Sequence, residues 1–176
     1  MFFKSFAFNG NISSWDVSSV MDMHRMFRGA NAFNQDISNW DVSNATSMSE
    51  MFIGADLFNQ NLGSWNVSKV STMRDMFNSS NLSTQNYDSI LISWNSLSNL
   101  TNNTILSAGN TQYCLGESAR ENIINSYNWT IQDSGKNCSV YENAFKSQWN
   151  TSANTTGSSA KTNIMLPLES DGTYNF

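Results

Sequence analysis

The chain has 176 residues, a net charge of −5 and a hydrophobic content of 39%, which is enough for one domain with a core and excludes a disordered chain. Its acidic balance argues against a nucleic-acid partner. One His and two Cys exclude a multi-His or all-thiolate metal site, so no cofactor is expected. No apolar stretch approaches the roughly 18 residues of a membrane span.

A 25-residue repeat occupies residues 1–80. Trp15, Trp40 and Trp65 mark its spacing, and no gaps are needed to align the units. Other positions keep the same step: Phe8, Phe33 and Phe58; Ile12, Ile37 and Leu62; Val17, Val42 and Val67; Met23, Met48 and Met73; Met26, Met51 and Met76, each followed by Phe. Such regular self-similarity predicts a repeat architecture in which neighbouring units share one core.

The first half of each unit predicts a short helix. Apolar residues recur at i, i+3, i+4 and i+7, as in Met48, Met51, Phe52 and Ala55. Ser47 and Glu50 have the spacing of a capping box at the start of that helix. Gly29 and Gly54 stand where a residue with positive φ would end it.

The second half of each unit predicts a short strand over residues 37–42. Ile37, Trp40 and Val42 match the L-x-x-L-x-L spacing of a leucine-rich repeat. We therefore expect an α/β repeat, in the form of a right-handed leucine-rich-repeat-like solenoid of about three strand–helix coils. The coils would span 1–25, 26–50 and 51–75, with a partial unit over 76–80.

Two polar columns accompany the apolar ones. Asn9, Asn34 and Asn59 are expected to form a buried ladder that satisfies backbone groups between units. A second column consists of Asp16, Asp41 and Asn66. It lies beside the Trp column, so its side chains should face solvent as a possible polar contact face. Weak Ca²⁺ ligation is the alternative, but two carboxylates and one amide are few for an ion that takes six to eight oxygens.

The repeat ends after Asn81. The apolar pattern of residues 81–138 then predicts a C-terminal α/β cap. Helices are expected over 87–94 and 118–124, followed by a strand over 129–131. Such a cap would seal the open end of the solenoid core. Cys114 and Cys138 flank the second helix and the strand and could form a disulfide, although two buried free thiols are also compatible with the sequence.

The remaining segment predicts a boundary between modules. Residues 139–161 are rich in Ser, Thr and Asn and resemble a linker, and residues 162–176 predict the truncated start of a further β domain. Met1 already occupies a repeat column, and the chain closes on an apolar strand. We therefore expect both ends to be cuts in a longer protein that carries neighbouring repeats and the rest of the β domain.

The unit from Met26 to Asn44 resembles the repeat of BspA-like leucine-rich-repeat bacterial surface proteins. Residues 87–135 resemble the tail that closes such arrays, and residues 145–176 resemble the start of a module that often follows them. The resemblance implies a secreted or surface-anchored bacterial protein linked to adhesion and to host or matrix contact. It brings no catalytic residues with it.

The residues themselves also give little support for catalysis. His24 shares its column with Ser49 and Arg74, as an exposed position would, and Asp36 and Glu50 belong to repeat columns. No phosphate-binding loop, nucleophile elbow or zinc-protease motif occurs. We therefore expect a non-catalytic extracellular or cell-surface module that contacts an unidentified protein or glycan. The alternative is a carbohydrate-binding or carbohydrate-active extracellular domain that uses exposed aromatic side chains.

Overall fold

The structure is a computed structural model that describes residues 1–142. Met1–Lys136 form one compact unit, and a second unit begins at Asn137. In chain order the elements are β1 (Thr72–Met73), α1 (Thr84–Asn95), β2 (Ile105–Ser107), α2 (Glu117–Tyr127) and β3 (Thr130–Gln132). The linker predicted over 139–161 lies almost wholly outside the described residues, and the β domain predicted over 162–176 lies entirely outside them.

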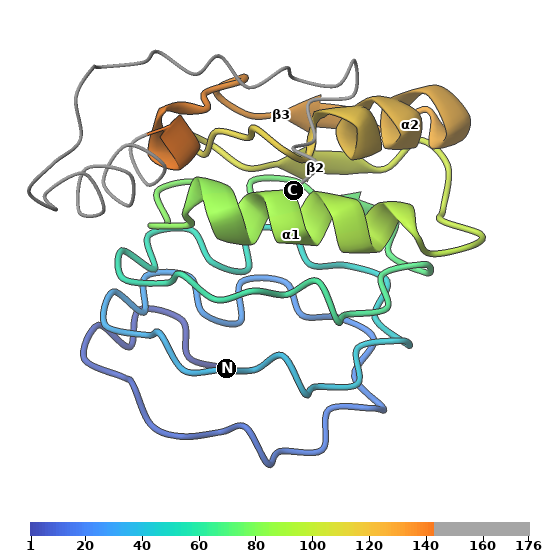
Figure 1. Ribbon diagram of the computed structural model, residues 1–176. Helices are drawn as coiled ribbons and strands as arrows, with labels where there is room; N and C mark the ends of the chain where they lie inside the picture. Colours follow the sequence, from blue (N-terminus) through green and yellow to red (C-terminus); the bar gives the residue numbers. More distant parts are fainter. Residues whose placement is uncertain (143–176) are drawn as a thin grey trace, which may run out of the picture. The chain divides into compact units, whose positions relative to one another are not determined.

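The prediction of a leucine-rich-repeat-like solenoid of strand–helix coils is wrong. The structure has a small open sheet of three parallel strands in the order β1-β2-β3, and α1 and α2 both follow residue 80 (Figure 1). Within residues 1–80 there is no helix, and β1 is the one strand. The predicted strand over 37–42 is absent, and the helix predicted around Met48 is a series of turns.

The backbone hydrogen bonds explain why the apolar spacing does not produce a helix. The N–H groups of Met23, Arg25 and Phe27 donate to carbonyls of the next unit, while those of Met26 and Arg28 donate three residues back along the chain. Half of the donors that an α-helix needs are therefore used between units. The residues at i, i+3, i+4 and i+7 still face the core, because a chain of tight turns presents the same face.

The 25-residue register places equivalent residues of successive units side by side. Phe27, Phe52 and Phe77 stack with ring centroids 5.6 and 5.7 Å apart. A second row, Phe33 and Phe58, is stacked at 6.0 Å, and Phe52 lies 3.9 Å from Phe58. Parallel, offset rings at these distances are a favourable aromatic geometry, so the ladder stabilises the register as well as filling the core.

The Trp column links each unit to the one before it. The indole N–H groups of Trp40 and Trp65 donate to the carbonyls of Ile12 and Ile37 at 3.1 and 3.0 Å. Trp94 in α1 makes the equivalent bond to Leu62 at 3.2 Å. Trp94 follows Trp65 by 29 residues and not by 25, because a helix advances only about 1.5 Å per residue and needs more residues to reach the same place.

The Asn ladder is present, but the prediction that it is buried is wrong, because none of its three members is buried. Asn9 and Asn34 are exposed, and Asn59 is half-buried. The side-chain oxygen of Asn9 accepts the N–H of Asn34 at 3.0 Å, and that of Asn34 accepts the N–H of Asn59 at 2.9 Å. The ladder thus satisfies backbone groups between units at the surface.

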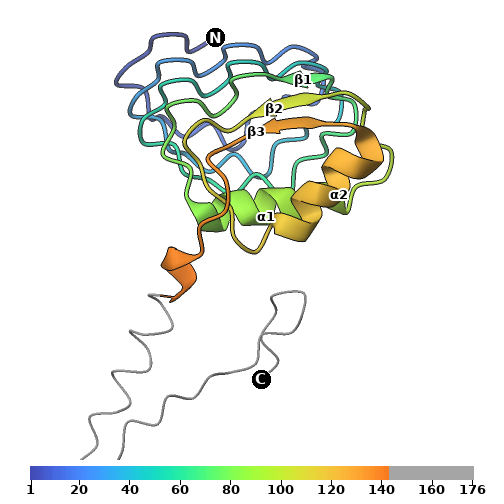
Figure 2. The same cartoon turned by 90° about the horizontal axis from the view of Figure 1, so that it is seen from above.

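The helices predicted after the repeat are confirmed as α1 and α2, and the last predicted strand is β3. Both helices lie along one side of the unit and the three strands along the other (Figure 2). Tyr87, Ile90 and Leu91 of α1 are fully buried. Gly29 and Gly54 have the predicted positive φ of 70° and 65°, although they end turns and not helices.

Asp88 of α1 fixes the start of α2. Its buried carboxylate accepts the backbone N–H groups of Cys114, Leu115 and Gly116 at 2.8–3.1 Å. Gly116 precedes α2 and offers no side chain to cap it, so Asp88 takes that role from the neighbouring helix. A Cβ at position 116 would lie 2.9 Å from the Asp88 carboxylate, which explains the glycine there.

The Trp column gives a prediction with a matched control. Trp65→Phe should destabilise the protein by about 1–3 kcal/mol, because it leaves the buried Ile37 carbonyl without its donor and removes core volume. Trp15→Phe should cost less than about 0.5 kcal/mol, since Trp15 is 41% exposed. Urea unfolding of both variants tests this; equal losses would contradict the role given to the indole bond.

Candidate functional site

The predicted polar column lies on the surface and consists of turn-forming side chains. Asp16, Asp41 and Asn66 are all exposed. Each side-chain oxygen accepts the backbone N–H two residues further on, at 3.0, 3.0 and 3.1 Å. One oxygen of each residue therefore holds an Asx turn, and the second polar atom remains available to a partner.

A second column repeats this arrangement five residues earlier in each unit. The side-chain oxygens of Asn11, Asp36 and Asn61 accept the N–H groups two residues on at 3.0, 2.9 and 2.9 Å. From the sequence, Asp36 was assigned only to a repeat column, and its partners Asn11 and Asn61 were not predicted. The sequence did contain a signal for these turns. Asn or Asp recurs every 25 residues at this position and stands two residues before Ser or Gly, a pattern that is typical of Asx turns.

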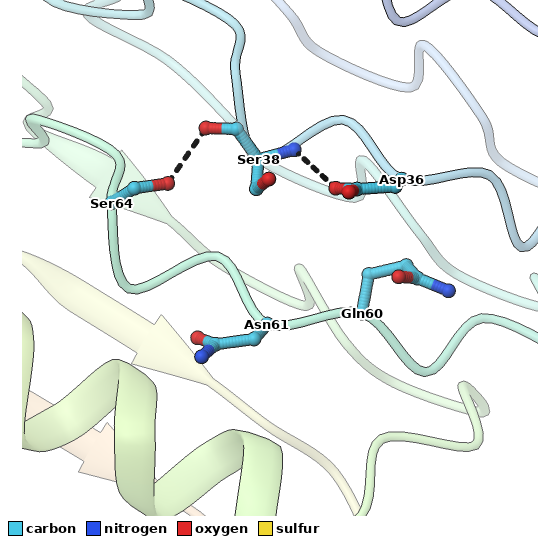
Figure 3. A pocket seen from close by; sticks show the side chains of 5 residues that line it. All are labelled: Asp36, Ser38, Gln60, Asn61 and Ser64. Atoms are coloured by element: carbon cyan, nitrogen blue, oxygen red, sulfur yellow. Dashed lines mark hydrogen bonds between the residues drawn. The ribbon is translucent and has the colours of Figure 1, made fainter.

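A hollow of about 320 Å³ lies on this polar face between the second and third units (Figure 3). Its lining residues are Asp36, Ser38, Gln60, Asn61 and Ser64. The Ser64 hydroxyl donates to the Ser38 carbonyl at 2.6 Å, which ties the two units together at the hollow. Gln60 likewise donates from Nε2 to the Asn34 carbonyl at 2.9 Å, so its Oε1 is not used in that bond.

The carboxylates of this face are held in their charged form. Hydrogen bonds from the Ser38 backbone and hydroxyl lower the pKa of Asp36. The hydroxyl and backbone N–H of Ser43 lower the pKa of Asp41, while the Asp16 carboxylate raises it and Lys69 lowers it. The hollow therefore offers one ionised carboxylate among uncharged donors and acceptors.

A charged edge lies on another part of the units. Arg25 donates to both oxygens of Glu50 at 2.9 Å, and Arg28 also pairs with Glu50. The hydrogen bond from Arg25 lowers the pKa of Glu50. The predicted capping role of Glu50 is thus wrong, because Glu50 has a φ of 59° in a turn and forms an ion-pair cluster with the preceding unit. The 25-residue separation of Arg25 and Glu50 was the available signal.

A buried polar cluster joins the two helices to the segment after β3, and no local pattern in the sequence indicates it. The hydroxyl of Tyr87 donates to Asp133 at 3.0 Å, and Arg120 Nε donates to the same carboxylate at 2.8 Å. Burial raises the pKa of Tyr87 well above its usual value, and Asp133 adds to this. Burial lowers the pKa of Arg120, but the hydrogen bond to Asp133 and the charge of its carboxylate raise it, and the net shift is upward. The guanidinium therefore stays charged. The cluster connects α1, α2 and β3.

The remaining predicted residues have these positions. His24 is exposed, as its column predicts, and its Nδ1 lies 2.9 Å from the Ser49 carbonyl. Cys114 and Cys138 are both disulfide-bonded, and neither is a free thiol.

In residues 1–142 no group of three or more His, Cys, Asp or Glu side chains could hold a metal ion. Within the same residues no helix is long and apolar enough to cross a bilayer.

The chain belongs to the DUF285 family, whose model is described as "Mycoplasma protein of unknown function, DUF285" and matches residues 1–106. This match covers the repeat units, β1 and α1, and it ends within β2. No curated protein and no solved structure gives a significant match.

The neighbouring carboxylates Asp16 and Asp41 give a prediction for how the stability of the fold depends on pH. The folded-state pKa of Asp41 lies below its unfolded value, so its stabilising effect is present above about pH 4 and is lost as the pH falls through the folded pKa. Asp16→Asn removes the neighbouring negative charge and should lower the pKa of Asp41 further. Carboxyl ¹³C NMR titration measures the pKa of Asp41 in the natural chain and in the Asp16→Asn variant. A higher Asp41 pKa in the variant would contradict the electrostatic coupling between Asp16 and Asp41.

Proposed function

We propose that the chain is a non-catalytic secreted or cell-surface module that makes protein or glycan contacts of the adhesion type. The hollow on the polar face carries this proposal. There Asp36, Gln60 and Asn61 come from two successive units and keep polar atoms that the Asx turns and ladder bonds do not use. Such a set of uncharged donors and acceptors around one carboxylate suits a hydroxyl-rich or amide-rich partner.

Three further observations support the extracellular part of the proposal. The chain has only 13% charged residues and presents repeating Asn and Ser side chains at the surface. Both cysteines are disulfide-bonded, and disulfides persist mainly in oxidising compartments. The unit from Met26 to Asn44 also resembles repeats of BspA-like bacterial surface proteins.

Binding by the full chain to arrays of glycans and of matrix proteins tests the proposal. Asp36→Asn keeps the turn-forming oxygen, as Asn11 and Asn61 show, but replaces the outward carboxylate oxygen with an amide donor. We expect it to weaken binding about 10- to 100-fold, the loss typical of one hydrogen bond to a charged group.

The control is Asp22→Asn, which makes the same chemical change in another Asx turn, where Asp22 accepts the His24 N–H at 2.9 Å, outside both the polar column and the hollow. It should leave the affinity within about twofold. An absence of binding across both arrays, or equal losses for the two variants, would overturn the assignment of the hollow. Labelling of intact cells with a membrane-impermeant reagent tests the surface location independently.

The carbohydrate-specific alternative is favoured by one observation, the exposed aromatic side chains of the first unit. Phe3, Phe6 and Trp15 are 47%, 62% and 41% exposed. Sugar rings stack on such faces. This alternative predicts that a bound glycan quenches Trp fluorescence in the natural chain but not in Trp15→Phe; quenching that persists in the variant would exclude Trp15 as the platform.

A further inference from the structure

The lining of the hollow on the polar face restricts the chemistry of its partner. Its residues Asp36, Ser38, Gln60, Asn61 and Ser64 are all polar, and Asp36 is the charged one among them. At about 320 Å³ the hollow has the size of a small-ligand site, but such sites are usually lined mainly by apolar side chains. A lining without apolar side chains fits a ligand whose own surface is polar.

The hydrogen bonds around the hollow fix which polar atoms are left for a ligand. Asp36 Oδ1 accepts the backbone N–H two residues further on at 2.9 Å, which leaves Oδ2 as an acceptor. Asn61 Oδ1 accepts the equivalent N–H at 2.9 Å, so its Nδ2 is left as a donor. Gln60 Nε2 donates to the backbone carbonyl and the side-chain oxygen of Asn34 at 2.9 and 2.8 Å, which leaves Oε1 as an acceptor. Two acceptors, one of them charged, and one donor therefore remain.

These atoms belong to two successive units that meet at the hollow (Figure 3). Asp36 comes from the second unit, and Gln60 and Asn61 come from the third. The Ser64 hydroxyl donates to the Ser38 carbonyl at 2.6 Å and holds the two units together there. A ligand group that donates to one unit and accepts from the other can therefore bridge them. A hydroxyl does both through a single oxygen atom.

We propose that the hollow binds a neutral saccharide through the hydroxyl groups at the edge of its ring; this inference rests on the proposed function. One sugar hydroxyl donates to Asp36 Oδ2 and accepts from Asn61 Nδ2, and these two bonds strengthen each other. A hydroxyl on the neighbouring carbon donates to Gln60 Oε1. None of the lining residues is aromatic, so this mode of binding does not depend on ring stacking.

Other ligand classes fit the hollow less well. An ammonium group could meet the two acceptors, but the Asn61 Nδ2 donor would then face a cation. An acidic saccharide would bring its charge to the Asp36 carboxylate, and none of the lining residues is cationic. A polypeptide offers amide groups, but protein interfaces have an apolar core that a polar lining does not supply.

Titration of the full chain with neutral methyl glycosides of glucose, galactose, mannose and fucose tests the proposal. The side-chain amide signals of Gln60 and Asn61 are followed by ¹⁵N NMR, and we expect saturable shifts of both with at least one glycoside. Asn61→Asp keeps the turn-forming oxygen, as Asp36 shows, but replaces the donor with a second carboxylate oxygen. We expect it to weaken binding about tenfold or more.

The matched control is Asn102→Asp, which adds the same charge at an exposed position outside the hollow. It should change the affinity by less than about twofold. A loss equal to that of Asn61→Asp would overturn the role given to the Asn61 donor.

The double variant Asp36→Asn with Asn61→Asp separates a hydroxyl ligand from the other classes. It exchanges the positions of the free carboxylate oxygen and the free amide donor. A hydroxyl can reverse the direction of both bonds, so we expect the double variant to bind the glycoside at least about fivefold more tightly than either single variant. A peptide amide has a fixed donor and a fixed acceptor and gains no such rescue.

Three outcomes would overturn the proposal. The first is glycoside binding without rescue in the double variant. The second is tighter binding of Nα-acetyl-lysine amide by Asn61→Asp than by the natural chain, together with no glycoside binding, since the site would then be cationic in its preference. The third is Asp36-dependent binding of matrix proteins without glycoside binding, which would leave the proposed function standing. A chain that binds none of these partners would overturn both.

Discussion

Hydrogen bonds between residues 24 or 25 apart in the chain are the interaction on which the rest of this structure depends. They run from backbone to backbone, as from Phe27 to Met51, and also through the Asn side chains. Because they fix the register, equivalent Phe rings meet, Trp indoles reach a carbonyl, and the polar columns form continuous rows. A shift by one residue would separate all of these partners at once.

The same bonds explain how residues 1–80 can bury a core with hardly any regular secondary structure. Backbone groups that usually pair within a helix or sheet pair instead between units and across tight turns, so few of them need water. The core that results contains Phe52, Phe58 and Trp65, all fully buried. Each unit supplies too little surface to be stable alone, and its stability comes from its neighbours.

The end of the repeat shows how the pattern changes into ordinary secondary structure. At α1 the Trp column continues through Trp94, while the backbone N–H of Ser83 continues the Asn ladder by donating to Asn59 Oδ1 at 2.9 Å. Beyond α1 the 25-residue spacing persists in the pairing of β2 with β3, as between Ile105 and Thr130, and long-range side-chain contacts are added to it. Asp88 caps α2, and Arg120 with Asp133 joins α2 to the segment after β3.

The sequence by itself determined the repeat, its register, and the apolar columns that supply the core, because a 25-residue spacing of apolar side chains appears directly in the order of residues. It also located α1, α2 and β3, whose apolar patterns are local. It could not distinguish a helix from a chain of turns around Met48, since both place i, i+3, i+4 and i+7 on one face. Only the tertiary structure decided this, because the partner of each backbone N–H lies a whole unit away. For the same reason only the tertiary structure revealed the hollow around Asp36 and the Tyr87–Asp133 cluster, because each joins side chains from segments that are far apart in the sequence.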